Sequence, residues 1–180
     1  FKNAFIKRLK EGLPECVPAP AIRGETITDL QDIRLNYPQQ SFDETVFPAS
    51  EKAAIARLRQ CCAQGAADYE ARRDFPAIEG TSRLSACLAL GALSPRQCLH
   101  RLLAEQPQAL DGGAGAVWLN ELIWREFYRH LMTYHPDLCK HRPFIRWTDK
   151  VQWQSNEKLL KAWQHGLTGC PMFVAAMGTP

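Results

Sequence analysis

The segment 117-VWLNELIWREFY-128 decides the fold class, because its residues repeat with the period of an α-helix. At roughly 100° per residue, one arc of about 120° carries two indoles, a carboxylate, a guanidinium and a phenol. These side chains belong to Trp118, Glu121, Trp124, Arg125 and Tyr128. A face used only for packing would hold Leu, Ile and Ala, since a buried charge costs roughly several kcal/mol unless it is paired. Two tryptophans are equally unusual on a face that meets only solvent.

This mixture of side chains favours a pocket for a flat, polar and aromatic guest, such as a nucleobase or a flavin. The indoles would stack on the guest, and Glu121 would accept hydrogen bonds from its edge. The same spacing is also typical of plain packing, in which Glu121 and Arg125 form an i, i+4 pair within a buried aromatic cluster. The spacing alone leaves both interpretations open.

Helical patterns continue on both sides of this segment and predict an all-α fold. Ser50 and the pair Ser94-Pro95 signal helix starts, and Pro76 signals a stop. Residues 14–49 contain five prolines and no sustained period, which indicates a long irregular connector. We therefore expect a connector with one short helix over 1–49 and a helical domain over 50–180. The predicted helices cover 1–11, 50–75, 81–93, 95–106, 114–134 and, as the last, 157–165.

The composition is that of an ordinary globular protein. The 180 residues are 46% hydrophobic and 23% charged, with a net charge of +3, which does not suit a histone-like polyanion binder. No apolar run approaches the roughly 18 residues of a membrane span. The seven cysteines form no C-x-x-C pair, so we expect reduced thiols in a cytoplasmic protein. His135, Cys139 and His141 lack a fourth ligand, and we expect no metal site.

Three further motifs each allow a functional and a structural interpretation. The run 79-EGTSRLS-85 suits a phosphate, because backbone N–H groups at a helix start favour anions, but it also suits a simple N-cap. The run 69-YEARRDF-75 could grip a phosphate backbone or form a solvated helix end. Trp147 and Trp153 are close in sequence to three cations, Arg142, Arg146 and Lys150. The two tryptophans could form cation–π contacts with them or could serve only in packing.

Three segments together resemble the helical flavin domain of class I cyclobutane pyrimidine dimer photolyases, in the photolyase/cryptochrome family. They are EGTSRLS at 79–85, GGAGAVWLNELIWREFYRHL at 112–131 and KHRPFIRWTDKVQWQSN at 140–156. The resemblance extends through about residue 169. Within the family, the chain is most similar to the bacterial type that carries a folate antenna. It implies FAD as cofactor, methenyltetrahydrofolate as antenna in the full-length protein, and a monomer that acts on DNA containing pyrimidine dimers. The implied reaction is a light-driven electron transfer from reduced FAD that splits the dimer.

The resemblance also implies roles for individual residues. The FAD phosphate side is implied to contact Tyr69, Thr81, Ser82, Arg83, Leu84 and Ser85, with Trp118 packed against the FAD. Glu121 and Trp124 are implied to line the pocket for the flipped dimer, and Arg73 to contact the DNA backbone. The DNA-facing stretch is implied to comprise Glu121, Leu122, Ile123, Trp124, Arg125, Glu126, Phe127 and Tyr128. Trp153 matches the outermost tryptophan of the chain that passes electrons to the flavin. Cys139 and Lys140 match the place where the protein approaches its folate.

The chain departs from the family pattern at both ends. It begins with Phe1, where an α/β antenna domain would end, and it stops at Pro180. The family would read roughly T-G-Y-P-[IV]-V-D-A-A-M-R near the end, whereas this chain reads TGCPMFVAAMGTP over 168–180. We therefore expect a truncated flavin domain that is inactive alone. A cryptochrome-like FAD photoreceptor and an inactive remnant are the alternatives.

Overall fold

The computed structural model describes residues 1–18, 21, 24 and 50–177. The chain forms two compact units, Phe1–Leu131 and Met132–Pro180. Within the described residues there are helices and turns but no strand, which confirms the all-α prediction. Of the predicted connector, residues 13–18 have no regular structure, and most of 19–49 lies outside the described part of the chain.

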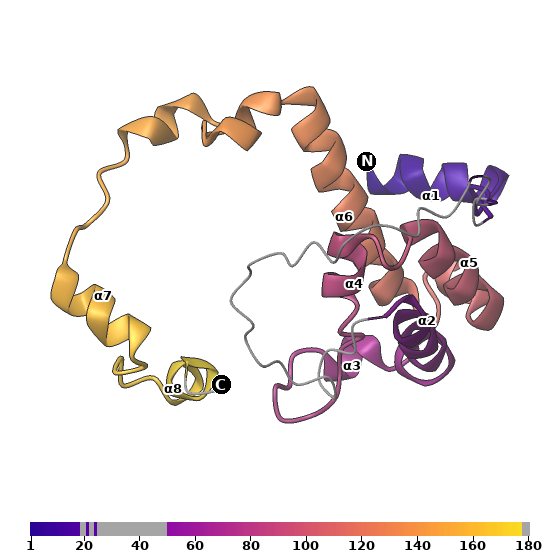
Figure 1. The fold of residues 1–180 in the computed structure, drawn as a ribbon, viewed down its shortest axis with the longest axis horizontal. Helices are drawn as coiled ribbons and strands as arrows, with labels where there is room; N and C mark the ends of the chain where they lie inside the picture. The colour runs from indigo at the N-terminus through magenta and orange to yellow at the C-terminus, as the bar shows by residue number, and fades with distance from the viewer. Residues whose placement is uncertain (19–20, 22–23, 25–49, 178–180) are drawn as a thin grey trace. The chain divides into compact units, whose positions relative to one another are not determined.

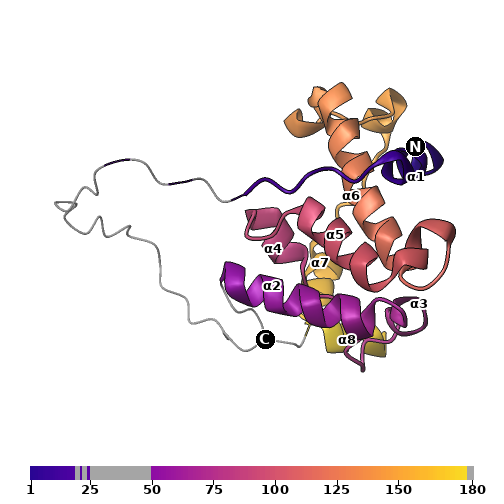
Figure 2. The same ribbon diagram turned by 90° about the vertical axis from the view of Figure 1, so that its right-hand side faces the viewer.

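The first unit is a group of helices around one apolar core (Figures 1 and 2). Its α-helices are α1 (Lys2–Glu11), α2 (Glu51–Gln60), α3 (Tyr69–Arg72), α4 (Ser85–Leu90), α5 (Pro95–Glu105) and most of α6 (Ala116–Tyr134). A π-helical turn, η1 (Cys61–Gly65), follows α2, and a 3-10 turn, η2 (Pro107–Asp111), follows α5. The core is built from Leu58, Cys62, Leu84, Leu93, Cys98, Leu102, Trp118, Leu119, Leu122 and Ile123, among others.

Two helix starts follow from side-chain capping, as the sequence predicts. The Ser50 hydroxyl accepts from the backbone N–H of Ala53 at 3.1 Å. Ser94 forms a full capping box with Gln97, and Pro95 occupies the first turn of α5. These bonds satisfy backbone N–H groups that a helix start otherwise leaves unpaired.

The predicted helix over 50–75 is confirmed at its start but is not continuous, because the chain changes its hydrogen-bond register after Gln60. The N–H of Ala66 donates to the carbonyl of Cys61 at 2.7 Å, which closes a wider π-helical turn. This turn ends α2, and a separate short helix, α3, begins at Tyr69. The widened turn has Cys62 fully buried in the core, while Cys61 faces a cavity described below.

The predicted helix over 81–93 is confirmed only over Ser85–Leu90. Arg83 has a φ of 51° and Gly91 a φ of 77°, both in the left-handed region that an α-helix does not continue through. Helix α4 is therefore confined to six residues between them. Burial of Leu84 fixes the loop that leads into it.

The second unit consists of short helical pieces. These are the 3-10 turns η3 (Pro136–Lys140) and η4 (Arg146–Lys150) and the helices α7 (Glu157–Gln164) and α8 (Pro171–Met177). The prediction that α7 is the last helix is wrong, since α8 follows it. Trp163 of α7 contacts Phe173 of α8, with ring centroids 6.1 Å apart.

The described residues offer neither a membrane-spanning helix nor a metal site. No helix there is long and apolar enough to cross a membrane. No group of three His, Cys, Asp or Glu side chains in the same part of the chain could hold a metal ion.

Candidate functional site

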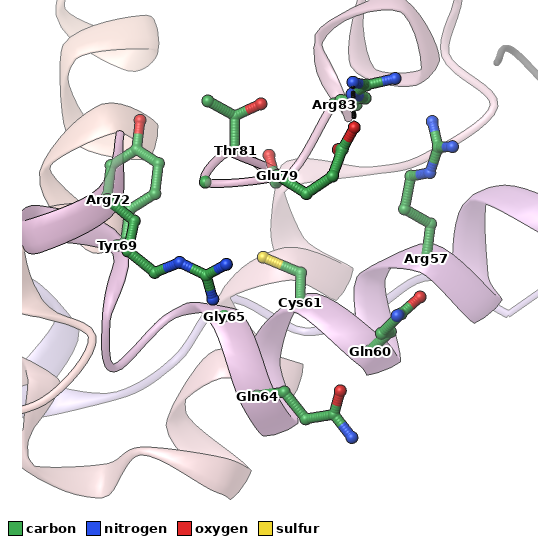
Figure 3. Close-up of a pocket in the computed structure, with 12 residues that line it drawn as sticks. Arg57, Gln60, Cys61, Gln64, Gly65, Tyr69, Arg72, Glu79, Thr81 and Arg83 are labelled. Atoms are coloured by element: carbon green, nitrogen blue, oxygen red, sulfur yellow. Dashed lines mark hydrogen bonds and ion pairs between the residues drawn. The ribbon is translucent and has the colours of Figure 1, made fainter. Parts of the chain in front are cut away.

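A cavity of about 360 Å³ lies between the end of α2, the turn η1, helix α3 and the loop 79–83 (Figure 3). The residues that line it are Arg57, Gln60, Cys61, Gln64, Gly65, Tyr69, Arg72, Glu79, Gly80, Thr81, Ser82 and Arg83. The structure thus brings together four of the predicted FAD contacts, Tyr69, Thr81, Ser82 and Arg83. Leu84 and Ser85 follow directly, one buried in the core and the other exposed at the start of α4.

The charge of the cavity favours an anion. Three arginines, Arg57, Arg72 and Arg83, line it together with one carboxylate, Glu79. Arg83 forms an ion pair with that carboxylate at the rim, drawn as a dashed line in Figure 3. Guanidinium groups bind phosphate oxygens through paired N–H donors, so a diphosphate suits a lining with three arginines.

The loop 79–83 lies directly against the backbone of α3. A Cβ atom added to Gly80 would stand 2.4 Å from the carbonyl oxygen of Arg72. Only glycine allows this approach, which places Thr81 and Ser82 on the cavity wall. The hydroxyl and arginine side chains that line this wall are a fit for a phosphate group, and FAD carries two.

The alternative interpretation of this motif, a side-chain N-cap, is wrong for α4. The residue before the helix is Leu84, and the cap has no side-chain hydrogen bond. Thr81 and Ser82 line the cavity and do not cap the helix through their side chains.

The thiol of Cys61 also faces the cavity (Figure 3). Burial raises the pKa of Cys61 from 9.0 to about 11. The thiol is therefore neutral at physiological pH and does not repel an anionic guest.

The five side chains expected to share one face of α6 do not share one environment. Trp118 is 3% exposed and belongs to the core, whereas Trp124 is 53% exposed. Trp124 stacks with Tyr128 at 6.0 Å and meets Phe127 edge-on at 5.6 Å. The exposed part of α6 is therefore an aromatic surface without Trp118.

Within the predicted DNA-facing stretch, Leu122 and Ile123 are buried in the core. The helical period turns them away from the exposed Trp124, so they support the surface from below. Glu126 is half-buried and pairs with Arg129 at 3.6 Å. Only part of this stretch can therefore meet another molecule directly.

Glu121 pairs with Arg73 and not with Arg125, so the i, i+4 alternative is wrong. The Arg73 Nη1 atom stands 2.7 Å from Glu121 Oε1, across 48 positions of sequence. Arg125 instead donates from Nη2 to the carbonyl of Leu88 at 3.2 Å.

The cavity and the exposed face of α6 are linked through Arg73. Its guanidinium carbon lies 5.7 Å from the ring centre of Tyr69, which lines the cavity. Burial raises the pKa of Tyr69, the charge of Glu121 adds to that rise, and Arg73 opposes it. Tyr69, Arg73 and Glu121 thus form a continuous contact chain from the cavity wall to α6.

The remaining predicted residues lie in the second unit. Trp153 is 87% exposed. Cys139 and Lys140 are exposed in η3. Nearby, His135 packs against Phe144 with ring centroids 4.9 Å apart. Among the described residues, neither Trp147 nor Trp153 forms a cation–π contact.

Sequence reasoning missed the cavity residues that α2 and η1 contribute. Arg57, Gln60, Cys61 and Gln64 recur at three- and four-residue intervals, which places them on one helical face. This spacing was a usable signal, but nothing in it indicates that the face meets a loop some twenty residues away.

Comparisons with known proteins point to one family. The family described as "FAD binding domain of DNA photolyase" matches residues 118–179. The chain is 72% identical over 98% of its length to the deoxyribodipyrimidine photo-lyase of Escherichia coli strain K12, and 69% identical over 98% to that of Salmonella typhimurium. It spans 38% of the length of each of these relatives.

A solved structure supports the same assignment. The chain is similar to the crystal structure of a bacterial class III photolyase from Agrobacterium tumefaciens, with a TM-score of 0.61 and 33% identity. The similarity covers 71% of this chain and 26% of that one. This chain therefore belongs to the DNA photolyase family and carries part of its helical FAD-binding domain.

Proposed function

We propose that this chain is part of a deoxyribodipyrimidine photolyase, which splits cyclobutane pyrimidine dimers in DNA. The observation that carries the proposal is the cavity lined by three arginines, on whose wall Gly80 packs against the backbone of Arg72. It lies within a chain that is 72% identical to a curated photolyase.

In this proposal the cavity holds the phosphate side of FAD. Arg57, Arg72 and Arg83 would contact the phosphate oxygens, and the hydroxyls of Thr81 and Ser82 would donate to them. When bound and reduced, the flavin supplies the electron that light drives into the dimer. Trp118, which is 3% exposed in the core, would pack against the flavin.

The exposed face of α6 would receive the damaged bases. An extruded pyrimidine dimer presents a flat face to Trp124 and hydrogen-bonding edges to Glu121. Extrusion of a dimer costs less than extrusion of sound bases, because the lesion is already poorly stacked. Trp153 would pass electrons toward the flavin, and Cys139 with Lys140 would approach a folate antenna.

A chimera tests this function. The chain would be extended at both ends with the corresponding parts of the Escherichia coli relative, and repair of a thymine dimer in a duplex would be followed under blue light and in the dark. We expect repair in the light only, and strong loss of repair in Trp124→Ala. A chimera that holds flavin yet repairs nothing in the light would refute repair and favour a photoreceptor.

A further inference from the structure

We infer that Glu121 restrains Arg73 in the unbound protein, so that undamaged DNA must displace a carboxylate before it can engage this arginine. Glu121 would thereby lower the affinity for undamaged DNA and act as a specificity-determining residue. The roles of Arg73 at the DNA backbone and of Glu121 at the dimer come from the proposed function.

The geometry of Arg73 supports a restrained cation. Its Nη1 atom is 2.7 Å from Glu121 Oε1, and its Nε atom is 3.7 Å from Asp74 Oδ1. The ring of Tyr69 lies on a further side of the guanidinium. Two carboxylates therefore surround the cation that the DNA backbone would use, and both repel a phosphate.

The same pair is accessible enough to be broken. The side chain of Arg73 is 36% exposed and that of Glu121 is 43% exposed. Exposed ion pairs are weak, and their loss typically changes an equilibrium by no more than about fivefold. A DNA phosphate can therefore displace Glu121 from Arg73. The displaced carboxylate of Glu121 then stays close to the phosphate without a cation to neutralise it.

A lesion removes this disadvantage, whereas undamaged DNA does not. The edge of an extruded pyrimidine carries N–H donors that can replace Arg73 as the partner of Glu121. Intact DNA keeps its bases stacked and offers the carboxylate nothing. Glu121 thus discriminates partly by opposing the wrong ligand, which is a general route to specificity.

The test is a double-mutant cycle on the 180-residue chain with a short undamaged duplex as the probe. The variants are Glu121→Gln, Arg73→Ala and the double variant, and binding is measured by fluorescence anisotropy at roughly 50 and 200 mM salt. Glutamine keeps the size of the side chain and removes its charge. We expect Glu121→Gln to tighten binding about two- to fivefold and to steepen the salt dependence by up to about 0.9 in log–log slope.

The gain must depend on Arg73. In the Arg73→Ala background, Glu121→Gln should leave the affinity unchanged. Glu157→Gln is the matched control, because it removes one negative charge from another exposed ion pair of 2.7 Å, with Lys161. It should give a smaller gain than Glu121→Gln, and the same gain with or without Arg73.

Three results would overturn the inference. They are an unchanged or weaker affinity in Glu121→Gln, an equal gain in the Arg73→Ala background, and no measurable duplex binding by any variant. None of these results bears on light-driven repair by the chimera, which is measured separately. Conversely, a coupled gain without repair would refute the proposed function and leave the restraint of Arg73 standing.

Discussion

Replacement of Gly80 by alanine should disturb the cavity more than any other glycine-to-alanine change on its wall. The added Cβ would stand 2.4 Å from the carbonyl oxygen and 2.7 Å from the carbonyl carbon of Arg72. Both atoms belong to the backbone of α3, so no side-chain rotation relieves the clash. The loop must move away from α3 and take Thr81 and Ser82 with it.

The size of the effect follows from overpacking at a backbone contact. Such changes typically cost about 1–3 kcal/mol of unfolding free energy. With a urea dependence of about 2 kcal/mol per M, the unfolding midpoint should fall by about 0.5–1.5 M. Gly65→Ala is the matched control, since Gly65 also lines the cavity and a Cβ there has nothing within 4 Å. Alanine at this helical position should be neutral or stabilising by up to about 1 kcal/mol.

Urea unfolding of the two variants, followed by circular dichroism, distinguishes the two positions. We expect a lower midpoint for Gly80→Ala and an equal or higher midpoint for Gly65→Ala. An unchanged midpoint for Gly80→Ala would show that the loop does not lie against α3, and would refute the cavity geometry.

Three other predictions concern the two tryptophans of α6, the buried cysteines and the cap of α5. Trp118→Ala should cost about 3–5 kcal/mol of unfolding free energy because Trp118 is buried, whereas Trp124→Ala should cost less than about 1 kcal/mol; similar losses would contradict the division of α6. Burial raises the pKa of both Cys62 and Cys98 from 9.0 to about 12, so native alkylation at neutral pH should spare them, and stability should fall as pH rises from about 9 toward 12. Mass spectrometry that finds both thiols labelled in the native chain would refute their burial. Ser94→Ala removes the capping box of α5 and should lower the unfolding free energy by about 1 kcal/mol; no change in urea would count against the cap.

Local chemistry made much of the fold predictable. Ser50 and Ser94 are caps whose side chains act on the next turn, so their helices begin where the sequence indicates. The break after Gln60 was not predictable in this way. No proline marks it, and the wider turn is the one in which Cys62 is fully buried in the core.

In the candidate site, too, local motifs were predictable and long-range contacts were not. The run of glycine and hydroxyl residues at 80–82 was found from its own chemistry, and the structure places it on the cavity wall. The partner of Glu121 was not predictable, since helical spacing favours Arg125 and the actual partner, Arg73, is 48 positions away. Likewise the period groups Trp118 with Trp124, but only packing against the other helices decides which indole is buried.

The proposed function requires the cavity beside Gly80 to hold the phosphates of FAD. Flavin content after gel filtration of the chimera tests it most directly, compared with the same chimera carrying Arg57→Ala and Arg83→Ala. We predict stoichiometric flavin absorbance in the chimera and its loss in the double variant, with the helical circular dichroism signal retained. Stoichiometric flavin in the double variant would show that the phosphates of FAD do not depend on the arginines of this cavity.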